Sequence, residues 1–167
     1  IGRVTYAEDR TRDDYIDHLA STVEDGLAGL RILVDCANGA ASATAPQLFD
    51  RFDDLHCDII NADPDGININ TNCGSTDLEG LAAMVKAGGY DLGLAFDGDA
   101  DRFLAVSEAG IPIDGDQVMA VCGRYLKSRG KLAGDTIVAT VMSNIGLHRF
   151  AAENNMEVVC TDCLLYT

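Results

Sequence analysis

Residues 92–106 read Leu92-Gly93-Leu94-Ala95-Phe96-Asp97-Gly98-Asp99-Ala100-Asp101-Arg102-Phe103-Leu104-Ala105-Val106, with three alternating carboxylates and an arginine between two apolar runs. Each run has the length and the residue mix of a buried strand. We therefore expect the six residues between the runs to form a loop that joins two strands. Small residues alternate with the carboxylates, so the backbone of this loop can curl around an ion.

The three carboxylates predict a metal site. Carboxylates this close along the chain repel one another at neutral pH. The usual reason to hold them together is a hard divalent cation, which takes oxygen ligands. We therefore predict that Asp97, Asp99 and Asp101 are metal ligands.

Three other interpretations of the acidic stretch fit it less well. An EF-hand calcium loop fits the three aspartates and Glu108, but Arg102 stands where that loop needs glycine, and the flanks read as strands. An aspartyl-phosphate phosphatase would use Asp97 as a nucleophile, which leaves Asp101 and Arg102 without a clear role. A solvated acidic turn seldom lies between two fully apolar runs.

The composition bounds the class of protein. The chain has 167 residues, of which 47% are hydrophobic and 23% charged, as in a soluble globular protein of one domain or slightly more. No stretch is long and apolar enough for a membrane span, and no signal peptide opens the sequence. A net charge of −15 argues against non-specific nucleic-acid binding. It also disfavours a phosphorylated substrate unless a cation and local arginines offset it.

The six cysteines predict free thiols in a reducing cytoplasm rather than a disulfide framework. Cys160 and Cys163 form a C-x-x-C pair at the end of the sequence. A zinc site would need a second such pair, and a redox site would need the start of a helix. We therefore assign this pair no function.

The rest of the pattern predicts an α/β fold with a mainly parallel sheet covered by helices on both faces. In such sheets, ligands bind beyond the carboxyl ends of the strands, where the acidic loop and the turn at Asn38 both lie. We read Asp35 and Asn38 as turn and cap residues in preference to a catalytic role. The residues from Thr76 to Glu79 read as a capping box, and Gly88-Gly89 as a helix end. The predicted helices are 13–26, 41–52, 76–87, 116–128 and 144–153, and the predicted strands are 30–34, 56–61, 92–96, 103–106, 111–113, 136–141 and 156–160.

The acidic stretch resembles the metal-binding loop of the α-D-phosphohexomutase superfamily, whose signature is Asp-Gly-Asp-(Gly/Ala)-Asp-Arg. Residues 64–76, Pro64-Asp65-Gly66-Ile67-Asn68-Ile69-Asn70-Thr71-Asn72-Cys73-Gly74-Ser75-Thr76, resemble the corresponding loop of the phosphoglucosamine mutase branch. The segments Val34 to Ala40, Ile113 to Gln117 and Met142 to Leu147 extend the resemblance over most of the chain.

The resemblance implies an isomerase that interconverts glucosamine 6-phosphate and glucosamine 1-phosphate through a phosphoserine and a bisphosphate intermediate. It implies Mg²⁺ at Asp97, Asp99 and Asp101, with Arg102 either supporting the phosphate or pairing with the acidic loop. The expected partner is a phosphorylated hexosamine, and binding to nucleic acid or to a membrane is not expected. The whole enzyme is expected to be cytoplasmic, and a homodimer is one possible assembly. A phosphomannomutase or phosphoglucomutase, or a metal-binding module without activity, remains an alternative.

The resemblance also implies the domain organisation. Residues 1–110 are expected to be domain 2 with the metal-binding loop, and residues 111–167 the first part of domain 3. The family's pattern breaks near Cys163, which indicates a truncation or a sequence error there. No serine of this chain has the context of the family's nucleophile, so we expect these residues alone to be inactive.

Overall fold

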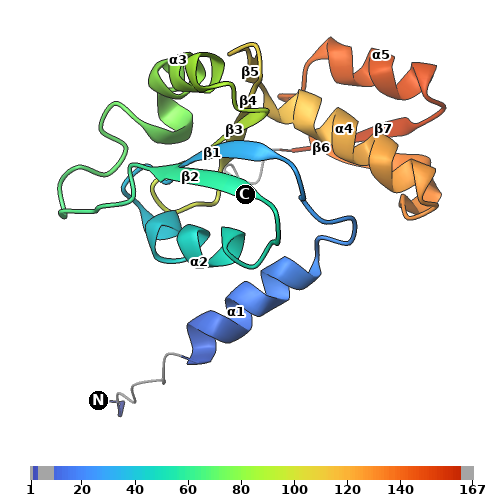
Figure 1. Cartoon of the computed structure of the whole chain (residues 1–167). Helices are drawn as coiled ribbons and strands as arrows, with labels where there is room; N and C mark the ends of the chain where they lie inside the picture. The colour runs from blue at the N-terminus through green and yellow to red at the C-terminus, as the bar shows by residue number, and fades with distance from the viewer. Residues whose placement is uncertain (1, 4–9, 163–167) are drawn as a thin grey trace. The chain divides into compact units, whose positions relative to one another are not determined.

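The computed structural model describes residues 2–3 and 10–162. Its contacts divide the chain into two compact units, Ile1–Pro112 and Ile113–Thr167. Each unit pairs β-strands with α-helices, as Figure 1 shows, so the predicted α/β class is confirmed. Among the described residues, no helix is both long enough and apolar enough to cross a bilayer.

The first unit is built on a five-stranded sheet with the order β2-β1-β3-β4-β5. The central strand β1 pairs in parallel with both β2 and β3, whereas β3 pairs antiparallel with β4. The sheet is therefore mixed with a parallel half, and the carboxyl ends of β1, β2 and β3 meet at one edge. The strands are β1 (Arg31–Asp35), β2 (His56–Ile60), β3 (Leu92–Phe96), β4 (Phe103–Ser107) and β5 (Pro112–Ile113).

Helices cover both faces of this sheet. Successive residues of β1 point to opposite sides, and the apolar residues on each side pack against a different helix. Leu33 packs in a cluster with Leu81 and Val85 of α3 (Glu79–Gly88). Val34 packs in a second cluster with Ala41 and with Ala45 of α2 (Ala45–Phe49). Figure 1 shows α3 and α2 on opposite sides of the sheet. A strand buried on both faces explains the continuous apolar run in the sequence.

The predicted helix over 41–52 is wrong as a single element. The structure has a short 3-10 helix, η1 (Ala40–Ala43), and then restarts as α2 with Pro46 in its first turn. Proline has no backbone N–H and its ring clashes with the carbonyl four residues earlier, so it belongs at a helix start and not inside a helix. Pro46 therefore separates the two pieces.

The predicted capping box at Thr76 is also wrong. Thr76 lies in a 3-10 turn, η2 (Gly74–Thr76), and its hydroxyl donates to the carbonyl of Cys73. Helix α3 begins only at Glu79, whose amide donates to Asp77 Oδ1 at 3.3 Å. The end of this helix is as predicted, because Gly89 caps it in the left-handed conformation with φ of 64°.

Helix α1 spans Arg10–Ser21 instead of 13–26. The hydroxyls of Ser21 and Thr22 donate to the carbonyls of His18 and Leu19, both at 2.7 Å, and so satisfy carbonyls that a longer helix would use. Only Ile16 of this helix is buried.

The second unit has a two-stranded parallel sheet of β6 (Thr136–Thr140) and β7 (Glu157–Thr161). Helices α4 (Gly115–Ser128) and α5 (Ile145–Glu153) lie in the same unit, and a short 3-10 helix, η3 (Ala133–Asp135), precedes β6. The unit is held by one apolar cluster, contributed by α5, β6 and the residue before β7: Ile137, Ala139, Leu147, Ala151 and Met156.

Candidate metal centre

The acidic loop from Asp97 to Arg102 joins β3 to β4. The rings of Phe96 and Phe103 pack at its base with centroids 5.8 Å apart. The backbone N–H of Asp97 donates to the Arg102 carbonyl at 3.3 Å, and the N–H of Arg102 donates back to Asp97 Oδ1 at 3.1 Å. The loop is therefore closed on itself at the end of the sheet.

The structure brings the three predicted ligands together. One carboxylate oxygen from each of Asp97, Asp99 and Asp101 lies within 4.8 Å of the others. Asp97 is 7% exposed and anchors the group, whereas Asp99 and Asp101 face solvent. Repulsion from the Asp99 carboxylate, with smaller effects of desolvation and Asp97, raises the pKa of Asp101, against the opposing effect of Arg102. Bringing a divalent cation among these oxygens would relieve that repulsion.

The two small residues of the loop serve different purposes. Ala100 adopts the left-handed conformation with φ of 61°, which turns the chain between the second and third carboxylate. Gly98 is buried, and a Cβ atom there would lie 2.6 Å from Ile69 Cδ1. Crowding thus explains the glycine at position 98, whereas Ala100 holds a left-handed conformation that alanine rarely adopts.

Arg102 lies beside the carboxylates. Its Nε is 3.8 Å from Asp97 Oδ2 and 3.9 Å from Asp101 Oδ1. These distances are those of loose ion pairs rather than hydrogen bonds. Because the side chain is 68% exposed, it is free to turn toward an incoming anion.

The turn after β1 touches the acidic loop, which the sequence reading did not foresee. Asn38 acts as the predicted turn residue: its φ is 48°, and its side-chain oxygen accepts the N–H of Asp63 at 3.2 Å. The backbone N–H of Ala40 donates to the carbonyl of Gly98 at 2.8 Å. The only sequence signal for this contact was that both segments follow strands at the same edge.

The cysteines supply no second metal centre in the part of the chain that the structure describes. The five cysteines found there are free thiols, and the aspartate trio is the only group of three or more potential ligands among the described residues. Cys160 is exposed with its Sγ 3.7 Å from His148 Nε2. Its partner in the C-x-x-C pair, Cys163, lies outside the described residues.

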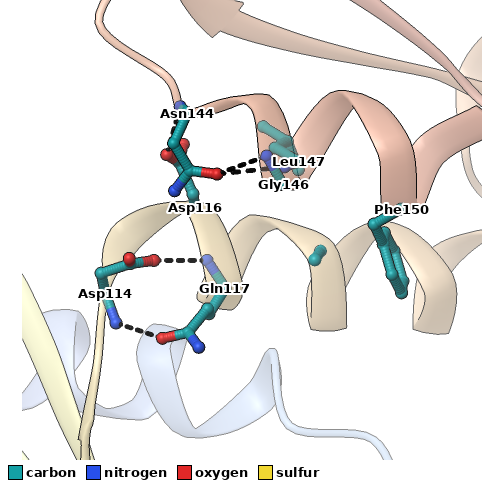
Figure 2. Close-up of a pocket in the computed structure, with 8 residues that line it drawn as sticks. Asp114, Asp116, Gln117, Asn144, Gly146, Leu147 and Phe150 are labelled. Atoms are coloured by element: carbon teal, nitrogen blue, oxygen red, sulfur yellow. Dashed lines mark hydrogen bonds between the residues drawn. The ribbon is translucent and has the colours of Figure 1, made fainter.

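A cavity of about 300 Å³ lies in the second unit, between the first turns of α4 and α5 (Figure 2). Asn144 caps α5 by accepting the N–H groups of Gly146 and Leu147, and its own N–H donates to Asp116 at 2.7 Å. Asp114 and Gln117 bond each other reciprocally at the start of α4. The polar groups of this cavity thus stabilise helix ends, and none of its lining residues is basic, so it has no side-chain cation to hold a phosphate.

Two family models match most of the chain. Residues 13–110 match the family model described as phosphoglucomutase/phosphomannomutase, alpha/beta/alpha domain II, and residues 114–163 match domain III. A phosphoglucosamine mutase from Acetivibrio thermocellus is 51% identical over 149 residues, which are 89% of this chain and 33% of that protein. The chain spans about one third of the length of its curated relatives.

Solved structures show the same fold. A phosphoglucomutase/phosphomannomutase family protein from Burkholderia thailandensis superposes with a TM-score of 0.76 at 26% identity, over 92% of this chain and 33% of that protein. The Aspergillus fumigatus N-acetylphosphoglucosamine mutase, in complex with GlcNAc-6P and magnesium, superposes with a TM-score of 0.66 at 22% identity, over 93% of this chain and 36% of that one.

Proposed function

Because the chain belongs to the phosphoglucomutase/phosphomannomutase family, we propose that it is the magnesium-binding part of a phosphoglucosamine mutase. The whole protein would interconvert glucosamine 6-phosphate and glucosamine 1-phosphate. The relatives at about 50% identity support the amino sugar, because they are phosphoglucosamine mutases. A phosphorylated hexosamine is therefore the proposed substrate.

The observation that carries the proposal is the trio of carboxylates within 4.8 Å of one another at the edge of a buried sheet. Mg²⁺ prefers six oxygen ligands in octahedral geometry and is usually held by a few carboxylates together with phosphate oxygens and water. Asp97, Asp99 and Asp101 fit that requirement by supplying three oxygens on one side. The magnesium in the Aspergillus fumigatus complex supports the choice of metal.

The residues of this chain would prepare the site for phosphoryl transfer, whose main demand is neutralisation of charge. Bound Mg²⁺ would supply Lewis-acid stabilisation of a phosphoryl oxygen. Asp97 is fixed by the Arg102 N–H at one oxygen, which leaves its second oxygen for the metal. The exposed guanidinium of Arg102 would add a planar, permanently charged donor for the same phosphate. In a chain of net charge −15, this local positive charge is needed to admit an anionic substrate.

The proposed metal site is tested by calorimetric titration of the purified chain with Mg²⁺ and Ca²⁺. The change Asp99→Asn keeps the shape of the side chain but removes a charge and a ligand oxygen. We expect it to weaken Mg²⁺ binding about tenfold or more, since even partners beyond the direct ligands contribute that much. Because Asp99 is exposed, its replacement should leave the unfolding temperature in EDTA unchanged.

Glu108→Gln is the matched control. Glu108 is also an exposed acid near β4, but it lies in the turn after that strand, beyond the acidic loop. We expect this variant to bind Mg²⁺ as the parent chain does. The magnesium assignment is wrong if Glu108→Gln abolishes binding and Ca²⁺ binds more tightly than Mg²⁺ by orders of magnitude.

A further inference from the structure

One buried carboxylate outside the proposed ligand set holds two loops together. Asp35 ends β1 and is 1% exposed. Its Oδ1 accepts the backbone N–H of Ala37 at 2.9 Å, and its Oδ2 accepts the N–H of Gly74 at 2.8 Å. The two amides belong to segments that are far apart in the sequence. Each oxygen of this side chain therefore fixes a different loop.

The first of these loops is held in a conformation that needs support. Ala37 and Asn38 both have positive φ angles, of 53° and 48°. Non-glycine residues rarely adopt such angles, and they persist where surrounding bonds impose them. The bond from Ala37 to Asp35 is one such restraint, and the bond from the Asn38 N–H to the Asn61 carbonyl, at 2.6 Å, is another.

This turn leads directly into the contact with the acidic loop. The N–H of Ala40 donates to the Gly98 carbonyl at 2.8 Å, and a Cβ atom on Gly39 would lie 2.2 Å from the same oxygen. Gly98 stands between Asp97 and Asp99. A shift of the turn would therefore move the backbone between two of the proposed ligands.

The second loop lies against the end of β3 and against the turn after β1. A Cβ atom on Gly74 would lie 2.5 Å from the Phe96 carbonyl oxygen and 2.5 Å from the Cβ of Ala37. The N–H of Asn70 donates to the Ala37 carbonyl at 2.9 Å. The turn after β1 thus packs against Gly98 within the acidic loop, and the second loop packs against Phe96, the last residue before that loop.

We propose that Asp35 is a positioning residue for the metal-binding loop. Its two hydrogen bonds set the turn after β1 and the start of η2, and these set the backbone at Gly98. The effect of Asp35 on Mg²⁺ affinity rests on the proposed function. Its effect on the position of the loop does not. Groups beyond the direct ligands commonly tune metal affinity in this way, by fixing the orientation of the ligands.

The test is Asp35→Asn in the purified chain, with two measurements. Asparagine can accept only one of the two N–H groups and presents its own N–H₂ to the other. Hydrogen exchange in metal-free protein should show faster exchange of the Ala40 amide than in the parent chain. Titration should show Mg²⁺ affinity about tenfold weaker. If this variant does not fold, Asp35→Glu, which keeps both oxygens and the charge but moves them outward, takes its place with the same expectations.

Val85→Ala is the matched control. Val85 is fully buried in the same unit, where α3 packs against the sheet, so its truncation lowers stability. We expect it to leave the Ala40 amide and the Mg²⁺ affinity close to those of the parent chain. If Val85→Ala changes the exchange of the Ala40 amide and the Mg²⁺ affinity as much as Asp35→Asn does, the cause is general destabilisation and the inference is overturned.

The outcomes separate the two proposals. A parent chain that binds no Mg²⁺ would refute the metal site, while the exchange of the Ala40 amide would still decide whether Asp35 positions the loop. An Asp35→Asn or Asp35→Glu variant with the parent's exchange at Ala40, or with the parent's affinity in a chain that binds Mg²⁺, overturns the inference.

Discussion

At the scale of single residues, burial separates two kinds of thiol. Burial, with a smaller effect of Asp35, raises the pKa of Cys36 to about 12, and burial, with a smaller effect of Asp58, raises that of Cys57 to about 11. Cys122 and Cys160 are exposed. Because the thiolate is the nucleophile, the raised pKa values should make Cys36 and the half-buried Cys57 unreactive at neutral pH.

We expect iodoacetamide at pH 8 to modify Cys122 and Cys160 well before Cys36. The shift of the Cys36 pKa from an ordinary value of 9.0 reduces its thiolate population about a thousandfold, in addition to the steric protection. The fold favours the protonated thiol, so this contribution to stability is complete below pH 9 and is lost as the pH rises through 12. Mass spectrometry of each site measures the rates, and a denatured sample is the control. Equal labelling of Cys36, Cys122 and Cys160 in the folded chain would contradict this assignment of burial.

The residues that could be predicted from the sequence are those whose chemistry is local. Asp97, Asp99 and Asp101 are neighbours in the chain, so the grouping of their carboxylates follows from spacing alone. Asp35 and Gly74 are bonded across 39 positions of sequence, and no local pattern joins them. The sequence therefore predicted that Asp35 is a turn residue but not which second loop it holds or what the turn contacts.

At the scale of elements, the start of α4 is stabilised by a capping box. Asp114 accepts the N–H of Gln117 at 2.8 Å, and the Gln117 side chain accepts the N–H of Asp114 at 2.9 Å. Such a reciprocal pair satisfies two amides that the helix itself leaves free. Helix α4 should therefore depend on this pair.

We expect Asp114→Ala to lower the free energy of unfolding of the second unit by about 1 kcal/mol, the usual value of an N-cap residue. Glu153→Ala is the control, because Glu153 is an exposed acid in the last turn of α5. Denaturant titration followed by circular dichroism compares the two. A loss equal to that of the control would show that the cap contributes nothing.

Periodicity predicted the existence of the elements better than their ends. The apolar strands and the helix that stops at Gly89 came out as expected, since burial and glycine conformation are strong local signals. Two features were not predicted: the interruption of the helix before Pro46 and the absence of a capping box at Thr76. Pro46 has no N–H to donate inside a helix, and the Thr76 hydroxyl donates to the Cys73 carbonyl, so the ends of both helices depend on single hydrogen bonds that periodicity does not report.

At the scale of the whole molecule, the two units have cores of different size. In the described residues, the first unit has buried clusters on both faces of a five-stranded sheet, and the second has one cluster beside a two-stranded sheet. On the second sheet, Val138 and Val159 are 64% and 41% exposed. Local stability should follow the amount of apolar surface buried.

We therefore expect residues 1–110 to be more protected from hydrogen exchange than residues 111–162. The comparison uses amides of β1 and β6, two strands of equal length, in the same sample. Protection of β6 as strong as that of β1, with no other chain present, would contradict this expectation.

The contact between Gly39 and Gly98 links the evolution of two loops that differ in chemistry. A side chain at position 39 would enter the peptide of the neighbouring loop, so this position admits a single amino acid for purely steric reasons. Asp99 faces solvent, so packing does not restrict its side chain and only the proposed cation binding would. A related protein that no longer bound a metal could replace these aspartates. It would still need glycine at position 39, because the backbone of the neighbouring loop leaves no space for a side chain there.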